Sequence, residues 1–363
     1  MKKVLLIADS NMSLSGVPVV FMSIIRALKN DYLFDIVILK DNDMYFEKEF
    51  LSYGGKIFRF NNKKPSKFLP KLIWLIRSYP KAVASFLKKE INIAQYDIIH
   101  SFHEGFSYPF LKTAKKTGVK KRILHICSAK SAYLTKRTLS QFLFDWYQRK
   151  AMDLCTNLVF VSKKSLQLNN YKNKGVVLYS TYDEIKFGHI VNCVSDTLSL
   201  TQIGTFSSRK NQLFSLKVIS ILKEKIPNIK LNIVGKELEE GYLEKINNFI
   251  SQNNLGNNVT FYKENYDRIE LSKRTSFIVY PSTMESFGLV LIESQACGIH
   301  CFANNSIPND ADMGNVDFIE LKPKIWAENI YNYYINYGNI RKKPINEEKF
   351  SSKQFVKTLK SIY

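Results

Sequence analysis

The sequence predicts an α/β protein made of two doubly wound domains, and three observations lead to this class. Short apolar segments with strand character alternate with helical segments through the whole chain. The alternation starts again near residue 198, which indicates a second domain of the same kind. A chain of 363 residues with 45% hydrophobic residues is long and apolar enough for two cores. We expect the boundary around residues 185–197, and ligands beyond the carboxyl ends of the strands.

The strand candidates are short runs rich in valine, isoleucine, leucine and phenylalanine. In the first half they lie at 4–8, 34–39, 56–60, 97–101, 122–126, 158–161 and 176–179. Helices are expected between several of them, at 19–28, 68–90, 106–117 and 138–153. In the second half, strands are expected at 199–204, 229–234, 258–261 and 277–280, and a last helix over 352–362. The continuously apolar run 4–8 is typical of a strand buried on both faces of a parallel sheet.

The most informative stretch joins a strand, a loop and a helix in the second half. The strand 277–280 leads into a loop that carries Glu285, and Gly288 opens a helical run that Gly298 ends. Glu293 lies inside this helix, eight positions after the first glutamate. Unpaired amides at a helix start attract phosphate, and a carboxylate two turns along can meet the hydroxyls of a ribose. This arrangement suits a sugar nucleotide.

At these residues the chain resembles the retaining glycosyltransferases of family 4. Their signature is two glutamates separated by seven residues, with Phe-Gly after the first and small residues after the second. It stands here as Glu285-Ser286-Phe287-Gly288 and Glu293-Ser294-Gln295-Ala296-Cys297-Gly298, with Ser294 where alanine is usual. The resemblance implies the GT-B fold, whose two Rossmann-like domains enclose a cleft. It also implies that Glu293 binds the donor ribose and that the amides of Phe287, Gly288 and Leu289 face the diphosphate.

A second match follows the first predicted strand of this half. Gly204 ends that strand, and a helical run begins after Asn211. In the family an arginine after this glycine and a lysine five residues later neutralise the donor diphosphate. Here Thr205 stands at the arginine position and Lys210 at the lysine position. The resemblance implies a diphosphate role for Lys210, and Arg209 is a candidate for the missing charge.

In the first half, the resemblance points to a loop and to three histidines. Relatives carry a glycine pair after their first strand, and here Ser15 and Gly16 occupy that place. In the family a histidine after a strand of this domain approaches the transferred sugar, and His125 is the best match. His100 and His103 are candidates for the acceptor side. Each of these histidines has a structural alternative, because a histidine at a strand end can be a hydrogen-bonded core residue.

No metal or other cofactor is expected. The histidines lack carboxylate or cysteine partners at ligand spacing, and Asp41-Asn42-Asp43 has the position of a turn. The chain has no G-x-G-x-x-G after its first strand, which argues against a nicotinamide or flavin enzyme. Five cysteines without Cys-x-x-Cys spacing, no signal-peptide core and no apolar run of about 20 residues predict a reduced cytoplasmic protein.

The charge is strongly positive and concentrated in the first half. Residues 1–185 contain 31 Lys and Arg against 14 Asp and Glu, a net charge of +17 out of +21. In residues 67–77, basic and apolar residues alternate as on a basic amphipathic helix. Such a face is attracted to anionic lipid, so we expect peripheral association with the inner face of the cytoplasmic membrane. No nucleic-acid-binding motif accompanies the charge, and nucleic acid is not expected as a partner.

The sequence therefore predicts a retaining glycosyltransferase of the hexosyltransferase type. Its expected donor is a nucleotide-diphosphate sugar, with uridine favoured, and its acceptor a glycan or a polyprenyl-diphosphate-linked glycan of surface polysaccharide biosynthesis. Glu285 would contact the transferred sugar or stabilise charge at its anomeric carbon. Two alternatives stay open: a GT-B sugar-nucleotide 2-epimerase, and a non-catalytic sugar-nucleotide-binding scaffold. The expected domains are 1–190 on the acceptor side, 191–345 on the donor side, and a helix in 346–363 that returns to the first domain.

Overall fold

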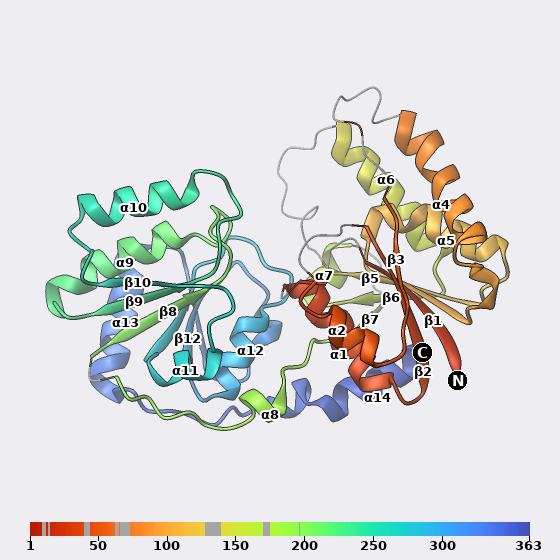
Figure 1. The fold of residues 1–363 in the computed structure, drawn as a ribbon. Helices are drawn as coiled ribbons and strands as arrows, with labels where there is room; N and C mark the ends of the chain where they lie inside the picture. Colours follow the sequence, from red (N-terminus) through yellow and green to blue (C-terminus); the bar gives the residue numbers. More distant parts are fainter. Residues whose placement is uncertain are drawn as a thin grey trace. The chain divides into compact units, whose positions relative to one another are not determined.

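The chain forms two compact units, each built around one parallel sheet (Figure 1). The computed structural model describes residues 1–8, 12–13, 15–39, 44–61, 65, 73–127, 139–169, 175–195 and 197–363. The first unit contains Met1–Tyr179 and Phe355–Tyr363, and the second contains Ser180–Gln354. Two doubly wound α/β units confirm the predicted fold class.

The boundary between the units lies after Tyr179, whereas the sequence analysis placed it after residue 190. The reason is a short helix, α8 (Glu184–Phe187), which packs on the second unit. The carbonyl of Phe187 accepts a hydrogen bond from the Cys297 thiol at 3.6 Å, and the amide of Val191 donates to the Cys297 carbonyl at 3.1 Å. The C-terminal segment predicted as 346–363 is also divided, since only residues from Phe355 onward belong to the first unit.

The sheet of the first unit has the strand order β3-β2-β1-β4-β5-β6-β7. All its strand pairs are parallel. The strands are β1 (Lys2–Ala8), β2 (Tyr32–Ile38), β3 (Ile57–Arg59), β4 (Ile98–Ser101), β5 (Lys121–Ile126), β6 (Asn157–Phe160) and β7 (Gly175–Val177). The helices are α1 (Gly16–Leu28), α2 (Glu47–Ser52), a π-helical turn η1 (Trp74–Ser78) that continues as α4 (Tyr79–Lys89), α5 (Tyr108–Lys116), α6 (Leu139–Leu154) and α7 (Lys163–Leu168).

Alternation along β1 builds a separate core on each face of this sheet. Val4 and Leu6 pack with α1 and α2, whereas Leu5 and Ile7 pack with α4, α5 and α6. The last helix, α14 (Ser352–Ile362), adds Leu359 to the first of these cores. All these side chains are buried, so the C-terminal helix is part of the hydrophobic core of the first unit.

The second unit repeats the pattern with the strand order β10-β9-β8-β11-β12-β13. Its strands are β8 (Ser199–Ile203), β9 (Lys230–Val234), β10 (Val259–Tyr262), β11 (Phe277–Tyr280), β12 (His300–Asn304) and β13 (Val316–Ile319). Its longer helices are α9 (Gln212–Lys225), α10 (Tyr242–Gln252), α11 (Arg268–Lys273), α12 (Leu289–Ala296) and α13 (Pro323–Tyr337). Helices α9, α10 and α13 cover one face around the fully buried Trp326. The sequence analysis did not predict β12 and β13.

The strand orders show where each sheet can bind a ligand. Chain progression reverses between β1 and β4 in the first unit and between β8 and β11 in the second. At such a switch point the loops after the two strands diverge and leave room beyond the carboxyl edge. Among the helices of the described residues, none has the length and apolar character needed to cross a bilayer.

Gly235, directly after β9, holds the loop after β8 in place. Its φ is +157°, and a β-carbon there would lie 2.2 Å from the backbone oxygen of Gly204. We expect Gly235→Ala to lower the free energy of unfolding by about 2–4 kcal/mol, because the strained backbone and the clash must both be relieved. Gly256 is the matched control, since a β-carbon at this position would have no atom within 4 Å. Urea unfolding should separate the two variants, and equal midpoints would contradict this explanation.

Candidate functional site

The switch point of the second unit brings together the two motifs found in the sequence. The loop after β8 carries Lys210, and the loop after β11 carries Glu285. The amide of Thr283 donates to the carbonyl of Arg209 at 2.9 Å. The side-chain amide of Asn211 donates to the carbonyl of Pro281 at 3.4 Å. These bonds tie the two loops into one structure at the carboxyl edge.

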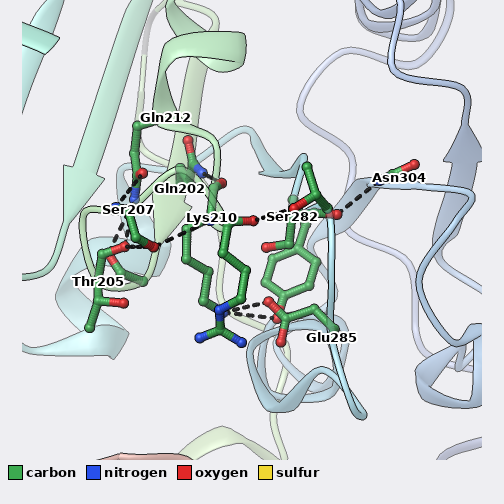
Figure 2. Close-up of polar contacts among 12 residues, drawn as sticks. Gln202, Thr205, Ser207, Lys210, Gln212, Ser282, Glu285 and Asn304 are labelled. Carbon is green, nitrogen blue, oxygen red and sulfur yellow. Dashed lines mark hydrogen bonds and ion pairs between the residues drawn. The ribbon is translucent and has the colours of Figure 1, made fainter. Parts of the chain in front are cut away.

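Lys210 reaches the centre of this edge by passing over Gly204. A β-carbon on Gly204 would lie 3.1 Å from Cδ of Lys210, so the glycine leaves the room that the lysine stem fills. The buried side-chain amide of Gln202 donates to the Lys210 carbonyl at 2.6 Å and fixes its backbone. Figure 2 shows Lys210 extending from the loop toward Glu285.

Lys210 and Glu285 form a largely buried ion pair. Nζ lies 2.6 Å from Oε1, and the two side chains are 13% and 10% exposed. Nζ also lies 3.5 Å from the hydroxyl of Tyr280. Burial alone would raise the pKa of Glu285, but the charges of Lys210 and Arg209 more than offset it, and the pKa lies below its usual value. Burial and the Glu285 charge raise the pKa of Tyr280, which therefore stays protonated.

The loop from Thr205 to Arg209 is fixed mostly through its backbone. The carbonyl of Thr205 accepts a hydrogen bond from Nε2 of Gln212 at 3.1 Å. Ser208 donates through its amide and its hydroxyl to Glu239, each at 2.7 Å. Arg209 is exposed, while its charge contributes to the low pKa of Glu285. Its guanidinium is therefore close enough to act on the same region as Lys210.

Helix α12 begins directly after the second loop. Gly288 precedes it with a φ of +123°, a conformation that favours glycine. The amide of Leu291 already bonds to the Gly288 carbonyl at 3.0 Å, whereas the amide of Leu289 has no acceptor within the helix. Phe287 is buried, and its ring centroid lies 5.9 Å from that of Phe350. The side chain of Phe287 therefore anchors the helix start, and only its backbone remains as a ligand candidate.

Glu293 lies inside α12 and pairs with an arginine that the sequence analysis did not single out. Oε2 of Glu293 lies 2.6 Å from Nη1 of Arg268, the first residue of α11. Asp267 caps that helix by accepting from the amides of Ile269 and Glu270. Burial raises the pKa of Glu293, and Arg268 offsets only part of this effect. The carboxylate is thus largely buried, with Arg268 as its ion-pair partner.

A small pocket lies beside this pair. Glu293, Arg268, Phe187, Ile203 and Ile278 are among the residues that line it. Its interior of about 10 Å³ corresponds to roughly one water molecule. Because Arg268 already contacts Oε2 of Glu293, a ribose hydroxyl that binds this carboxylate must share it with the arginine or displace the arginine.

Two of the three predicted histidines lie deep in the core of the first unit. His100 and His125 are fully buried, and their rings stack at 5.5 Å with Phe102 beside them. Nδ1 of His100 is 2.6 Å from the hydroxyl of Tyr363. Among the described residues, neither ring nitrogen of His125 has a hydrogen-bond partner. These positions fit the structural alternative.

His103 is placed differently from the other two histidines. It is only partly buried, follows β4 at the switch point of the first unit, and stacks on Phe106 at 5.0 Å. The next residue, Glu104, has a φ of +41°, which is rare for a residue other than glycine. Strained backbone of this kind is concentrated at functional sites.

Burial of the histidines gives a pH dependence of stability. It lowers the pKa of His125 to about 3 and that of His100 well below its usual value. Below pH about 6.5 the unfolded chain takes up protons that the folded protein does not. The neutral, buried histidines therefore contribute fully to the free energy of unfolding above that pH, and this contribution is lost as the pH falls toward 3. Between pH 6.5 and 5, we expect the slope of the unfolding free energy against pH to decrease by about 1 kcal/mol per pH unit in His125→Phe. If urea unfolding gave the same slope against pH for the wild type and His125→Phe, His125 would not be buried and neutral in the folded protein.

The predicted first loop lies only partly within the described residues. Ser15 precedes α1, and its hydroxyl is 2.9 Å from that of Ser13. Gly16 is exposed, and a β-carbon in its place would meet no atom within 4 Å. The fold itself therefore does not require a glycine at this position. Asp41-Asn42-Asp43 lies outside the described residues.

The described part of the chain shows no group of three or more His, Cys, Asp or Glu side chains that could hold a metal ion. The charged side chains at the switch point of the second unit instead pair with one another, as Lys210 with Glu285 and Arg268 with Glu293. Sequence reasoning missed Arg268, Tyr280 and Gln202. The last residue of β11, Tyr280, was part of a predicted strand, and the N-cap signal of Asp267 could have drawn attention to Arg268.

Comparisons with known proteins show what the sequence and the fold of this chain are similar to. Residues 192–313 match the family model described as glycosyl transferases group 1. The structure of Anabaena Alr3699/HepE in complex with UDP and glucose superposes with a TM-score of 0.77 at 14% identity, over 99% of both chains. The chain therefore has the GT-B fold, and its residues 192–313 are similar to the group 1 glycosyltransferases.

Two curated relatives extend the similarity over most of the chain. EpsF of Bacillus subtilis (strain 168) is 25% identical over 350 residues, which cover 88% of this chain and 85% of EpsF. The capsular polysaccharide biosynthesis glycosyltransferase CapH of Staphylococcus aureus is 24% identical over 337 residues, with 88% of each chain covered. The similarity to these relatives therefore includes the first unit as well as the matched domain.

Proposed function

We propose that this protein is a retaining glycosyltransferase that moves a hexose from a uridine-diphosphate sugar to a glycan of surface polysaccharide biosynthesis. The observation that carries the proposal is the buried Lys210–Glu285 pair at the switch point between β8 and β11. Such a pair supplies a cation and a carboxylate, the two kinds of group that the proposal assigns to the diphosphate and to the sugar. The HepE complex with UDP and glucose and the capsular name of CapH support the donor class and the process.

In this proposal the donor lies along the carboxyl edge of the second unit. The ammonium of Lys210, the guanidinium of Arg209 and the amides from Phe287 to Leu289 face the diphosphate. Gly204 leaves room for the lysine, and Thr205 stands where relatives have an arginine. Charge on the diphosphate increases as the sugar departs, so these groups stabilise the transition state more than the bound donor. A metal ion is not required for this neutralisation.

The carboxylate of Glu293 receives the ribose hydroxyls. It pairs with Arg268, and a hydroxyl that donates to a carboxylate forms a charge-assisted hydrogen bond. Glu285 lies at the sugar end of the donor and stabilises positive charge that develops at the anomeric carbon. The acceptor hydroxyl attacks from the face that the diphosphate leaves. The bond between the anomeric carbon and the phosphate oxygen breaks, and the departing diphosphate keeps the electron pair and accepts the proton of the acceptor.

The structure changes the choice of histidine in this proposal. His125 was predicted to orient the sugar, but it is fully buried among His100 and Phe102 and serves the core. We assign the role to His103, which is partly exposed after β4 and next to the strained Glu104. Ser15 and Gly16 follow the neighbouring strand β1 and are proposed to face the acceptor. The acceptor is proposed to be a glycan carried on polyprenyl diphosphate, at the cytoplasmic face of an anionic membrane.

An activity screen tests the proposal. The protein is incubated with uridine-, guanosine- and adenosine-diphosphate hexoses, with and without a lipid-linked glycan extract. We expect nucleotide release only with a uridine donor and acceptor, and a product whose anomeric configuration, read by proton NMR, equals that of the donor. Inversion of the anomeric centre would contradict the retaining mechanism. Isomerised donor without acceptor would identify a 2-epimerase. Tight donor binding without transfer would identify a scaffold, an alternative suggested by Thr205 at the position where relatives have an arginine.

A further inference from the structure

Four large apolar side chains form an exposed surface on two helical segments of the first unit. Ile73 and Ile76 belong to the turn that leads into α4, and their side chains are 52% and 55% exposed. Phe142 and Trp146 lie one turn apart on α6 and are 61% and 42% exposed. We call these four residues the two-helix surface.

The two segments are joined beneath this surface. The hydroxyl of Tyr147, the buried neighbour of Trp146, donates a short hydrogen bond to the carbonyl of Leu75. Leu75 is itself buried between the exposed Ile73 and Ile76. One face of each segment therefore belongs to the core, and the apolar residues of the two-helix surface are on the opposite faces. Single exposed apolar residues are common, but four large ones on joined segments indicate an interaction site.

Exposed basic residues follow the two-helix surface along the same two segments. On the exposed faces of the same helices lie Arg77, Lys81, Arg149 and Lys150. Nζ of Lys150 lies 6.0 Å from the ring of Trp146. Between Glu49 and Glu90 the chain has ten basic residues and no acidic one, and between Glu104 and Asp145 nine and none. A lipid bilayer with anionic headgroups has a negative surface above an apolar interior. An apolar surface next to basic residues is complementary to both.

Chain connectivity places this surface at the ligand-binding edge of the sheet. Strands β3 and β5 end at the carboxyl edge, and the chain next enters the segment of Ile73 and helix α6 at their N-terminal ends. Phe142 and Trp146 lie in the N-terminal half of α6, and Ile73 and Ile76 precede α4. In Figure 1, α6 and the start of α4 project beyond the same side of the sheet of this unit. A surface that binds lipid there would be close to the loops that follow β1 and β4.

We infer that the two-helix surface inserts into the interface of an anionic lipid bilayer, with Phe142 and Trp146 reaching the acyl boundary and the surrounding basic residues contacting the headgroups. The proposed function includes a membrane partner, and the inference specifies which part of the protein contacts that membrane and how deeply it inserts. It does not depend on the donor site. Aromatic rings and basic side chains have different preferences within a membrane interface, so the two kinds of residue make separable contributions.

Vesicle co-sedimentation tests the inference on the whole protein. We expect binding to vesicles of phosphatidylcholine with about 30% phosphatidylglycerol, and at least ~10-fold weaker binding to phosphatidylcholine alone. The variant Phe142→Ser/Trp146→Ser should lose at least ~10-fold in binding to the anionic vesicles. The control Leu238→Ser/Ile335→Ser removes two apolar residues of the second unit that are at least as exposed, and it should bind like the wild type. Equal binding of all three proteins would overturn the inference.

Tryptophan fluorescence measures insertion directly. Trp326 is fully buried and Trp74 is partly buried, whereas Trp146 is exposed. Brominated lipids in the anionic vesicles should quench the wild-type protein, and in Trp146→Phe this quenching should be lost while binding persists. Binding without quenching in the wild type would show attraction to headgroups alone and would overturn insertion.

Two further outcomes would replace the lipid by another partner. Loss of a dimer in the Phe142→Ser/Trp146→Ser variant, seen by sedimentation velocity, would identify a second copy of this chain as the occupant. Retention on RNA, with no binding to anionic vesicles, would identify a nucleic-acid surface. A thermal-shift titration with uridine diphosphate should give the same response in the wild type and this variant, so failure of membrane binding is distinguishable from failure of the proposed function.

Discussion

Replacing Lys210 with alanine is expected to lower turnover at least ~100-fold, the effect of removing one strong group that stabilises departing negative charge. The same change should weaken binding of uridine diphosphate at least ~10-fold and leave binding of uridine unchanged, because only the diphosphate meets the ammonium. Isothermal titration with both ligands separates this role from a general loss of structure. Equal losses for uridine and uridine diphosphate would contradict it.

The Lys210→Ala change also leaves Glu285 buried without its main partner. The pKa of Glu285 should then rise, because burial is no longer offset by the lysine. Since an unpaired buried charge destabilises a protein, the double variant Lys210→Ala/Glu285→Gln serves as a second measurement that leaves no such charge. It should recover stability but not the binding of uridine diphosphate. Lys217→Ala, at an exposed position on α9, is the matched control and should behave like the wild type.

Replacing Glu293 with alanine is expected to remove the distinction between ribose and deoxyribose. A charged hydrogen bond contributes about 1.5–3 kcal/mol, so the wild type should bind uridine diphosphate about 10- to 100-fold more tightly than its 2′-deoxy analogue. In Glu293→Ala the two affinities should be equal, and most turnover should be lost. Glu328→Ala, an exposed carboxylate on α13, should keep the wild-type preference. If Glu293→Ala still bound uridine diphosphate more tightly than its 2′-deoxy analogue, the ribose would bind elsewhere.

Arg268 gives the same site a characteristic response to pH. Burial already raises the pKa of Glu293, and Arg268 supplies the largest opposing charge. In Arg268→Ala the pKa should rise further, so the preference for ribose should weaken as the pH falls and return as the pH rises and Glu293 ionises. Arg268→Lys should restore part of the wild-type profile. A preference in Arg268→Ala that is lower than in the wild type but independent of pH would indicate a merely structural role.

The fold was largely predictable because its signals are local and redundant. Runs such as Val4–Ala8 and Phe277–Tyr280 are apolar throughout, as strands covered on both faces must be. Strands β12 and β13 were missed because His300, Asn304 and Asp317 interrupt their apolar character, and these side chains find partners only in the folded unit. The domain boundary was misplaced for a similar reason, since the packing of Phe187 on the second unit is a tertiary contact.

The candidate site was predictable where the chain carries the motifs of the family that it resembles. Lys210, Glu285 and Glu293 were all named from the sequence, and the structure places the first two in direct contact. The partner of Glu293 was not predictable, because Arg268 comes from a separate helix and only the parallel sheet brings the two side chains together. His125 was preferred to His103 because it is the best match to the family's histidine, and its burial within β5 is not visible in a single sequence.

The central claim is that the second unit holds an activated sugar by its diphosphate and its ribose. A crystal structure of the protein grown with uridine diphosphate tests this claim directly. We predict a diphosphate oxygen within roughly 3 Å of Nζ of Lys210 and a ribose hydroxyl at a similar distance from a carboxylate oxygen of Glu293. Nucleotide bound away from both side chains, with the Lys210–Glu285 and Arg268–Glu293 pairs unchanged, would contradict the account.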